Sequence, residues 1–220
     1  MLESVSSARA GFTREDILFI ESLHDLGESE AIQRLAQDPE CLQQILDQPE
    51  IRRALLESPV AVPVSPSLYF YTIVRHALLD AGLDHIGITD HIAGVLVNKL
   101  GGTSSLNGEP QVWTTHAVDF IAQTRQASGL LKVHLEVAAG NQFLILTGLF
   151  PDFIEQRSQR CGAPGIEFYS SFAQQSYHRA SNDRSLGAES RKLFGLLAEA
   201  FPVARRSLNR MRENQLFLGT

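Results

Sequence analysis

Hydrophobic positions dominate one long stretch, Leu130 to Phe150, where polar side chains stand singly or in pairs; these are Lys132, His134, Glu136, Asn141 and Gln142. A helix that is apolar on most sides is typical of a protein interior, so this pattern predicts a buried central helix. One alternative stays open: residues 132–137 alternate strictly, and residues 138–141 could turn the chain into a second strand of a β-hairpin. We favour the helix, because a lone hairpin is only marginally stable.

Apolar residues at helical spacing, between proline, glycine and capping residues, predict helices along the rest of the chain. Thr13 with Asp16 resembles a capping box, and Thr89 or Asp90 is expected to cap a helix that runs to Leu100. Pro151 and Pro202 are expected to open helices. The predicted helices are residues 13–26, 29–36, 39–46, 49–56, 67–81, 89–100, 112–127, 151–160, 166–181, 186–200 and 202–217, with a loop at 101–110.

A short repeat lies near the N-terminus: residues 39–46 (PECLQQIL) align with residues 49–56 (PEIRRALL). Proline at the first helical position and glutamate beside it favour two short helices. The repeat resembles the Asp-Pro-rich helical modules of co-chaperones, a resemblance that implies a cradle for apolar peptides and covers about 20 of the 220 residues.

Three prolines in the segment SPVAVPVSPS prevent a continuous helix at residues 59–66. We interpret this segment as a connector between an appendage of short helices (residues 1–58) and a main helical domain (residues 67–220). The predicted fold class is therefore all-α, a multi-helix bundle around a buried central helix with an N-terminal appendage.

Charge is unevenly distributed along the chain. Residues 1–60 carry a net charge of −7, residues 61–150 carry −2 and residues 151–220 carry +3. An acidic head and a basic tail can pair within one chain or across a dimer. Homo-oligomerisation or another protein partner is therefore expected, although both regions could also be simple solvated helix faces.

Composition also limits the compartment and the class of protein. No apolar run reaches the length of a membrane span, and residues 1–16 lack the apolar core of a secretory signal. Cys41 and Cys161 fit neither a disulfide framework nor a zinc module. We therefore expect a cytoplasmic protein without a membrane partner.

Motifs for metal or phosphate chemistry are incomplete in this sequence. Glu21-Ser-Leu-His24 is a single Glu-x-x-His unit, whereas a di-iron bundle needs two. The His24-Asp25 doublet resembles that of the HD-domain metal phosphohydrolases, but residues 1–23 lack the upstream histidine that this family needs. The glycines of residues 101–108 lack the lysine of a phosphate-binding loop. We therefore predict no metal site and no catalytic residue, and leave the cofactor unknown.

The charge of the chain argues against a nucleic-acid partner. The segment from Asp84 to Leu100 is similar to a helix-turn-helix, yet it carries aspartates where a recognition helix normally carries positive charge. Arginines cluster at 205, 206, 210 and 212, and we expect these to form a solvated face or to meet the acidic head.

The remaining candidate is a set of polar residues that interrupt apolar helices, and buried charges of this kind need partners. Two functions follow: a non-catalytic protein that acts through protein–protein contacts and self-associates, or a small-molecule- or metal-binding enzyme or sensor with a central pocket. Whether the protein is an enzyme stays open. The pocket of the second hypothesis would be lined by Arg75, His76, His134, Glu136, Tyr177 and His178.

Overall fold

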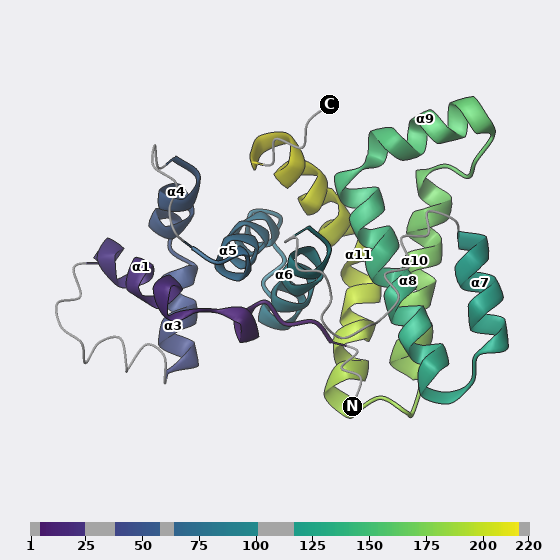
Figure 1. The fold of residues 1–220 in the computed structure, drawn as a ribbon, viewed down its shortest axis with the longest axis horizontal. Helices are drawn as coiled ribbons and strands as arrows, with labels where there is room; N and C mark the ends of the chain where they lie inside the picture. The colour runs from purple at the N-terminus through teal and green to yellow at the C-terminus, as the bar shows by residue number, and fades with distance from the viewer. Residues whose placement is uncertain (1–4, 25–37, 58–63, 101–116, 216–220) are drawn as a thin grey trace.

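The computed structural model describes residues 5–24, 38–57, 64–100 and 117–215 (Figure 1). Within these ranges the chain forms ten α-helices and no β-strand, and the helices pack against one another. The protein is an all-α multi-helix bundle, and the predicted fold class is confirmed.

Helix α8 (Gly129–Leu149) is a continuous helix through the stretch for which a hairpin was the alternative, so the helical interpretation is confirmed. It packs against α7 (Ala117–Gln126), α10 (Ile166–Asn182) and α11 (Ala188–Gln215), which lie beside it in Figure 1. Nearly all of its second half is buried. The predicted helix 112–127 corresponds to α7, and residues 101–116 lie outside the described ranges.

Two glycines allow close packing around α8. A Cβ atom on Gly140 would lie 2.6 Å from a ring carbon of Tyr177 on α10, and one on Gly148 would lie 2.8 Å from Cβ of Leu208 on α11. Real Cβ atoms do not approach other atoms this closely, so only glycine permits these helices to approach α8 as they do.

Helices α5 (Pro66–Leu79) and α6 (Ile86–Leu100) pack against each other and against α11. In Figure 1 they are seen nearly end-on and cross the direction of α8. Helix α5 begins at Pro66, where the hydroxyl of Ser65 accepts a hydrogen bond from the Leu68 amide at 3.1 Å. Most side chains of α5 are buried, as the near-absence of a polar face predicts.

Helices α1 (Arg14–His24), α3 (Pro39–Leu46) and α4 (Pro49–Glu57) lie at the opposite end of the molecule from α7 (Figure 1). The predicted capping box is confirmed: the Asp16 amide donates to Thr13 Oγ1 at 3.3 Å, and the Thr13 amide donates to the Asp16 carboxylate at 2.8 Å. The repeat also forms the two short helices that it predicts. The predicted helix 29–36 and most of the connector lie outside the described residues.

The apolar side chains of α3 and α4 face the interior. Leu42, Ile45 and Leu46 of α3 and Ile51 of α4 are buried in a hydrophobic cluster that continues into α5. These residues therefore fill the protein's own core and do not line a free cradle. The division into an appendage and a main domain stays a prediction, although α4 packs directly on α5.

Helix α6 begins earlier than predicted, at Ile86, and neither Thr89 nor Asp90 caps it. The side chain of His85 takes this role, since its Nδ1 accepts a hydrogen bond from the Ile88 amide at 3.1 Å. Thr89 Oγ1 instead donates to the backbone oxygen of His85 at 3.2 Å, as a threonine inside the first turn can do.

The prediction of two helices at 186–200 and 202–217 is wrong, because α11 is one helix with Pro202 inside it. Proline has no amide hydrogen, so the carbonyl of Ala198, four residues earlier, lacks its usual helical donor. Gln174 of α10 supplies a donor, since its Nε2 lies 2.8 Å from the Ala198 oxygen. A side chain of the neighbouring helix thus satisfies the carbonyl that Pro202 leaves open.

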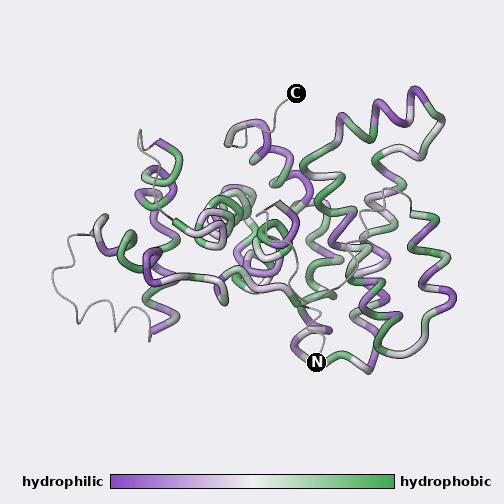
Figure 2. The backbone as a smooth tube through the Cα atoms, viewed as in Figure 1, coloured by the Kyte–Doolittle hydropathy of each residue, from purple (hydrophilic) through white to green (hydrophobic). Residues whose placement is uncertain are grey.

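Helix α9 (Pro151–Cys161) opens at Pro151, as predicted, and bends away from α8 by 92°. It ends at Cys161, and Gly162 follows as its C-cap with a φ of 63°. The tube of α9 is mostly hydrophilic in Figure 2. Among the described residues no single helix is long and apolar enough to cross a membrane; the bent pair of α8 and α9 meets the length and composition criteria only when taken together.

Candidate functional site

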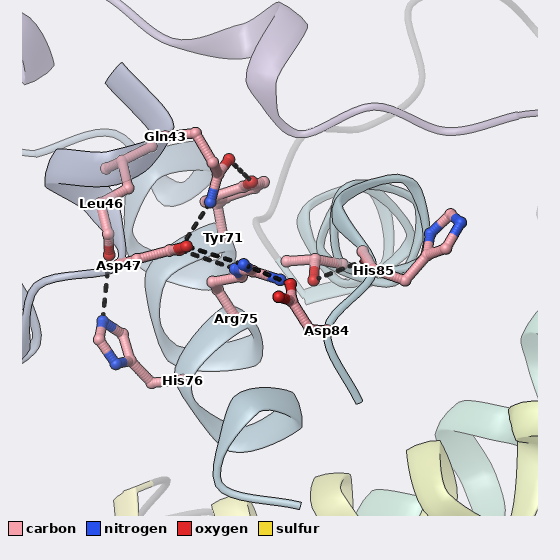
Figure 3. A network of polar contacts seen from close by, with 9 residues as sticks. Gln43, Leu46, Asp47, Tyr71, Arg75, His76, Asp84 and His85 are labelled. Carbon is pink, nitrogen blue, oxygen red and sulfur yellow. Dashed lines mark hydrogen bonds and ion pairs between the residues drawn. The ribbon is translucent and has the colours of Figure 1, made fainter. Parts of the chain in front are cut away.

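Arg75 lies at the centre of a polar network between α3, α5 and the turn before α6 (Figure 3). Its side chain is 2% exposed, and it donates to both carboxylate oxygens of Asp47 at 2.7 Å. Its Nη2 also lies 2.8 Å from Asp84. A fork of this kind is the strongest geometry for an arginine–carboxylate contact.

The charges of this network are set by these contacts. Burial alone would raise the pKa of Asp47, but the hydrogen bonds and the positive charge of Arg75 hold it below its ordinary value. The hydrogen bond from Arg75 to Asp47 raises the pKa of the guanidinium, despite burial. Both groups therefore stay ionised, and Arg75 has no proton to exchange at neutral pH.

Gln43 and Tyr71 extend the network. The Tyr71 hydroxyl donates to Oε1 of Gln43, whose Nε2 donates to Asp47 at 2.7 Å. Burial raises the pKa of Tyr71 to about 12, so its phenol is neutral. Oγ1 of Thr72 and Nη1 of Arg75 are buried without a hydrogen-bond partner in the described part of the chain, which costs stability.

His76 is also buried and ties α5 to the end of α3. Its Nε2 lies 3.1 Å from the backbone oxygen of Leu46, and because a carbonyl only accepts, this nitrogen carries the proton. Burial lowers the pKa of His76, so the ring is neutral at neutral pH. Arg75 and His76 thus both bond to the end of α3.

Glu136 belongs to a second group, between α8 and α10. It is 6% exposed and accepts two hydrogen bonds from Arg179, each at 2.8 Å. Nη2 of Arg179 also donates to Ser176 at 3.0 Å, and the guanidinium lies over the ring of Phe172 at 5.9 Å. The sequence indicated that Glu136 needs a partner, but not that the partner is Arg179.

Tyr177 lies on the same helix and is fully buried. Its hydroxyl donates to Oδ1 of Asn141 at 2.7 Å, and Nε2 of His91 lies 2.8 Å from the same oxygen. Burial raises the pKa of Tyr177, so the phenol does not ionise near neutral pH. Sequence analysis missed His91; its position within an apolar helix was the available signal.

The other two predicted residues lie at or near the surface. His178 is exposed on α10 and its Nδ1 is 3.1 Å from Asn182. His134 is half-buried on α8, while Glu136, two positions further along the helix and roughly 200° around it, is buried. The hydrogen bonds described above therefore join Arg75 and His76 to α3, and Glu136 and Tyr177 to partners on α10 and α8.

Two of the cavities that open at the surface of the described residues lie between helices. The first, of about 300 Å³, lies between α10 and α11 and contains one predicted residue, His178; its lining is Ser171, Gln174, Gln175, His178, Ala198 and Glu199. The second, of about 270 Å³, lies between α9 and α11 and is lined in part by Arg205, Arg206 and Arg212. No group of three or more His, Cys, Asp or Glu side chains in the described ranges could hold a metal ion.

Comparisons with protein-family models, with curated proteins and with solved structures gave no match for this chain. The chemistry of this protein is therefore inferred from the geometry of its side chains alone. Arg75, His76, Glu136 and Tyr177 bond to partners on neighbouring segments, which makes them structural ties between helices. Ligand binding by the six predicted residues stays a prediction.

Proposed function

We propose that this protein acts through protein–protein contacts, as a self-associating, non-catalytic helical protein whose acidic N-terminal helices take part in the contact. The observation that carries the proposal is the separation of charge between the two ends of the chain, −7 in residues 1–60 and +3 in residues 151–220. Complementary charge favours encounter and register between two copies.

Surface side chains in the acidic region support this contact. Glu15 of α1, Glu40 of α3 and Glu57 of α4 are exposed. Helices α1 and α4 pack against each other, and they also carry exposed leucines: Leu18 is 42% exposed and Leu56 is 36% exposed. Apolar side chains within a charged rim are the usual composition of a non-obligate interface.

The complementary surface is the C-terminal half of α11. Arg206 and Arg210 are exposed there and lie one turn apart, on the same face of the helix. A second copy of the chain is therefore the partner whose acidic helices would meet these arginines. We also propose a cytoplasmic location, which the free thiols of Cys41 and Cys161 support.

Charge reversal on each side tests this arrangement. We expect Arg206→Glu/Arg210→Glu to weaken self-association about tenfold or more, and Glu15→Lys/Glu57→Lys to do the same, because each variant places like charges across the contact. An equimolar mixture of the two variants should associate again as a heterodimer. Sedimentation velocity on each sample measures this outcome.

Arg160→Glu is the matched control, since Arg160 is exposed in the last turn of α9, away from the proposed contact. It should associate like the wild type. Thermal unfolding of each variant checks that the helices are intact. If neither reversal weakens association, or if the mixture does not restore it, the proposed contact is wrong.

A further inference from the structure

The N-terminal segment of residues 5–9, here called the strap, lies along α6. Asp90 holds it through three hydrogen bonds: its backbone oxygen accepts from the Ala8 amide at 3.3 Å, and its carboxylate accepts from the Arg9 amide at 2.8 Å and from the Ser7 hydroxyl at 2.7 Å. The strap packs closely against α6 at Gly94, because glycine has no side chain: a Cβ atom there would lie 2.8 Å from the Ser7 nitrogen.

A fourth hydrogen bond joins the strap to a buried histidine. The Ser6 amide lies 3.1 Å from Nδ1 of His91. Because an amide N–H only donates, Nδ1 must carry a lone pair. The proton of the neutral ring is therefore on Nε2, which donates to Oδ1 of Asn141 at 2.8 Å.

Several elements surround this imidazole. The strap contributes the Ser6 amide, α8 contributes Asn141, and α10 contributes the Tyr177 hydroxyl, which bonds to the same Asn141 oxygen. Helix α11 places the edge-on ring of Phe194 at 5.5 Å. Asp90, on the same helix, is the charged group that acts on His91.

The balance of these groups favours the neutral ring. Burial lowers the pKa of His91, and the hydrogen bonds and the negative charge of Asp90 only partly oppose this effect. A proton on Nδ1 would point at the Ser6 amide, which is itself a donor.

We propose that the strap is a pH-sensitive latch, which is docked on α6 while His91 is neutral and is released when His91 takes a proton on Nδ1. Protonation at that nitrogen would leave two N–H groups facing each other, so the Ser6 hydrogen bond must break. The strap would then keep its hydrogen bonds to Asp90 and the burial of Ala8, but these would be opposed by two N–H groups that face each other without an acceptor. This regulation is separate from the proposed self-association and does not depend on it.

The direction of the pH dependence follows from linkage. With the strap released, Nδ1 meets water and the ring should titrate near the ordinary histidine pKa of about 6.5. Docking is therefore strongest above this pH. Below it, the equilibrium constant for docking of the strap should fall by about tenfold per pH unit, until His91 also protonates in the docked state.

Hydrogen exchange of the Ala8 and Arg9 amides measures docking directly, because both amides donate to Asp90. With exchange rates corrected for the intrinsic effect of pH, we expect their protection factors in the full chain to fall by about tenfold per pH unit below about pH 6.5. Amides within α10 should keep their protection, which shows that the bundle remains folded.

His91→Asn is the matched variant, because its side-chain oxygen can accept from the Ser6 amide without titrating. Its strap protection should not change with pH. If that variant does not fold, Ser6→Pro removes the amide and leaves His91 in place; strap protection should then be lower at neutral pH and should lose the tenfold dependence. Constant protection in the wild type, or an unchanged pH dependence in either folded variant, would overturn the proposal.

Discussion

At the scale of single residues, the buried polar side chains of this protein act as ties between helices. Arg75 and Glu136 each form a two-pronged contact with an oppositely charged partner, Asp47 and Arg179 respectively. Arg75 and Glu136 are the buried members of these pairs, so removal of Asp47 or Arg179 would leave a buried charge without its partner, which is costly. The interruptions of apolar helices by these residues are thus explained by partners on other elements.

The sequence predicts that these buried side chains need partners, but it does not predict which partners they have. The apolar context of Arg75 and Glu136 indicated that each needs a partner. The identity of the partner depends on how far one helix is shifted along another, and local patterns do not contain that information. The antiparallel arrangement of α8 and α10 sets Glu136 beside Arg179, and Asn141 beside Tyr177.

A prediction at this scale concerns Gly140. Gly140→Ala should lower the free energy of unfolding by about 1–3 kcal/mol, because its Cβ would meet the buried ring of Tyr177 at 2.6 Å. Gly195→Ala is the matched control, since its Cβ would meet only ordinary contacts, the nearest at 3.7 Å. That change should stabilise the protein by about 0.5–1 kcal/mol.

Denaturant unfolding of the two variants beside the wild type provides the measurement. The contrast in sign is the essential result, because both substitutions replace glycine by alanine inside a helix. Equal stabilisation by both alanines would mean that α8 and α10 are not in close contact at Gly140.

At the scale of elements, the apolar periodicity predicts most of the helices, but some of the predicted helix ends are wrong. The capping box of Thr13 and Asp16 and the prolines at 39, 49 and 151 could be recognised locally. The start of α6 could not, because His85 is an unusual capping residue. Because proline suits the first turn of a helix, the local sequence predicts that a helix begins at Pro202. Its place inside α11 depends on Gln174, a residue of another helix.

The proline in α11 allows a test of this dependence. Gln174→Ala should cost about 1–3 kcal/mol of unfolding free energy, because the buried carbonyl of Ala198 then has no donor. In a Pro202→Ala background the new amide satisfies that carbonyl, so the same Gln174→Ala change should cost less. The double-mutant cycle should therefore give a coupling of about 1 kcal/mol.

Gln175→Ala is the control for this cycle. Gln175 is the exposed neighbour on α10 and borders the same cavity, so its removal should leave the unfolding free energy nearly unchanged in both backgrounds. A cycle without coupling would show that the Gln174 side chain does not compensate for Pro202.

At the scale of the whole molecule, the described helices form one packed bundle with a continuous hydrophobic core. The fold class could be predicted because nearly every segment has helical periodicity and suitable caps. The arrangement of the candidate site could not, because six residues on three helices converge only if those helices meet at the right places. The proposed function therefore depends on the surface, where charge is separated between the acidic helices and α11.

Sedimentation equilibrium of the wild-type chain, over a range of concentrations and at two salt concentrations, tests the proposed self-association most directly. We expect the average mass to rise from 24.3 kDa towards twice that value as the concentration increases. Added salt should shift the rise to higher concentrations, because exposed charges are screened. A mass that stays at 24.3 kDa up to high micromolar concentration in low salt would contradict the proposed self-association.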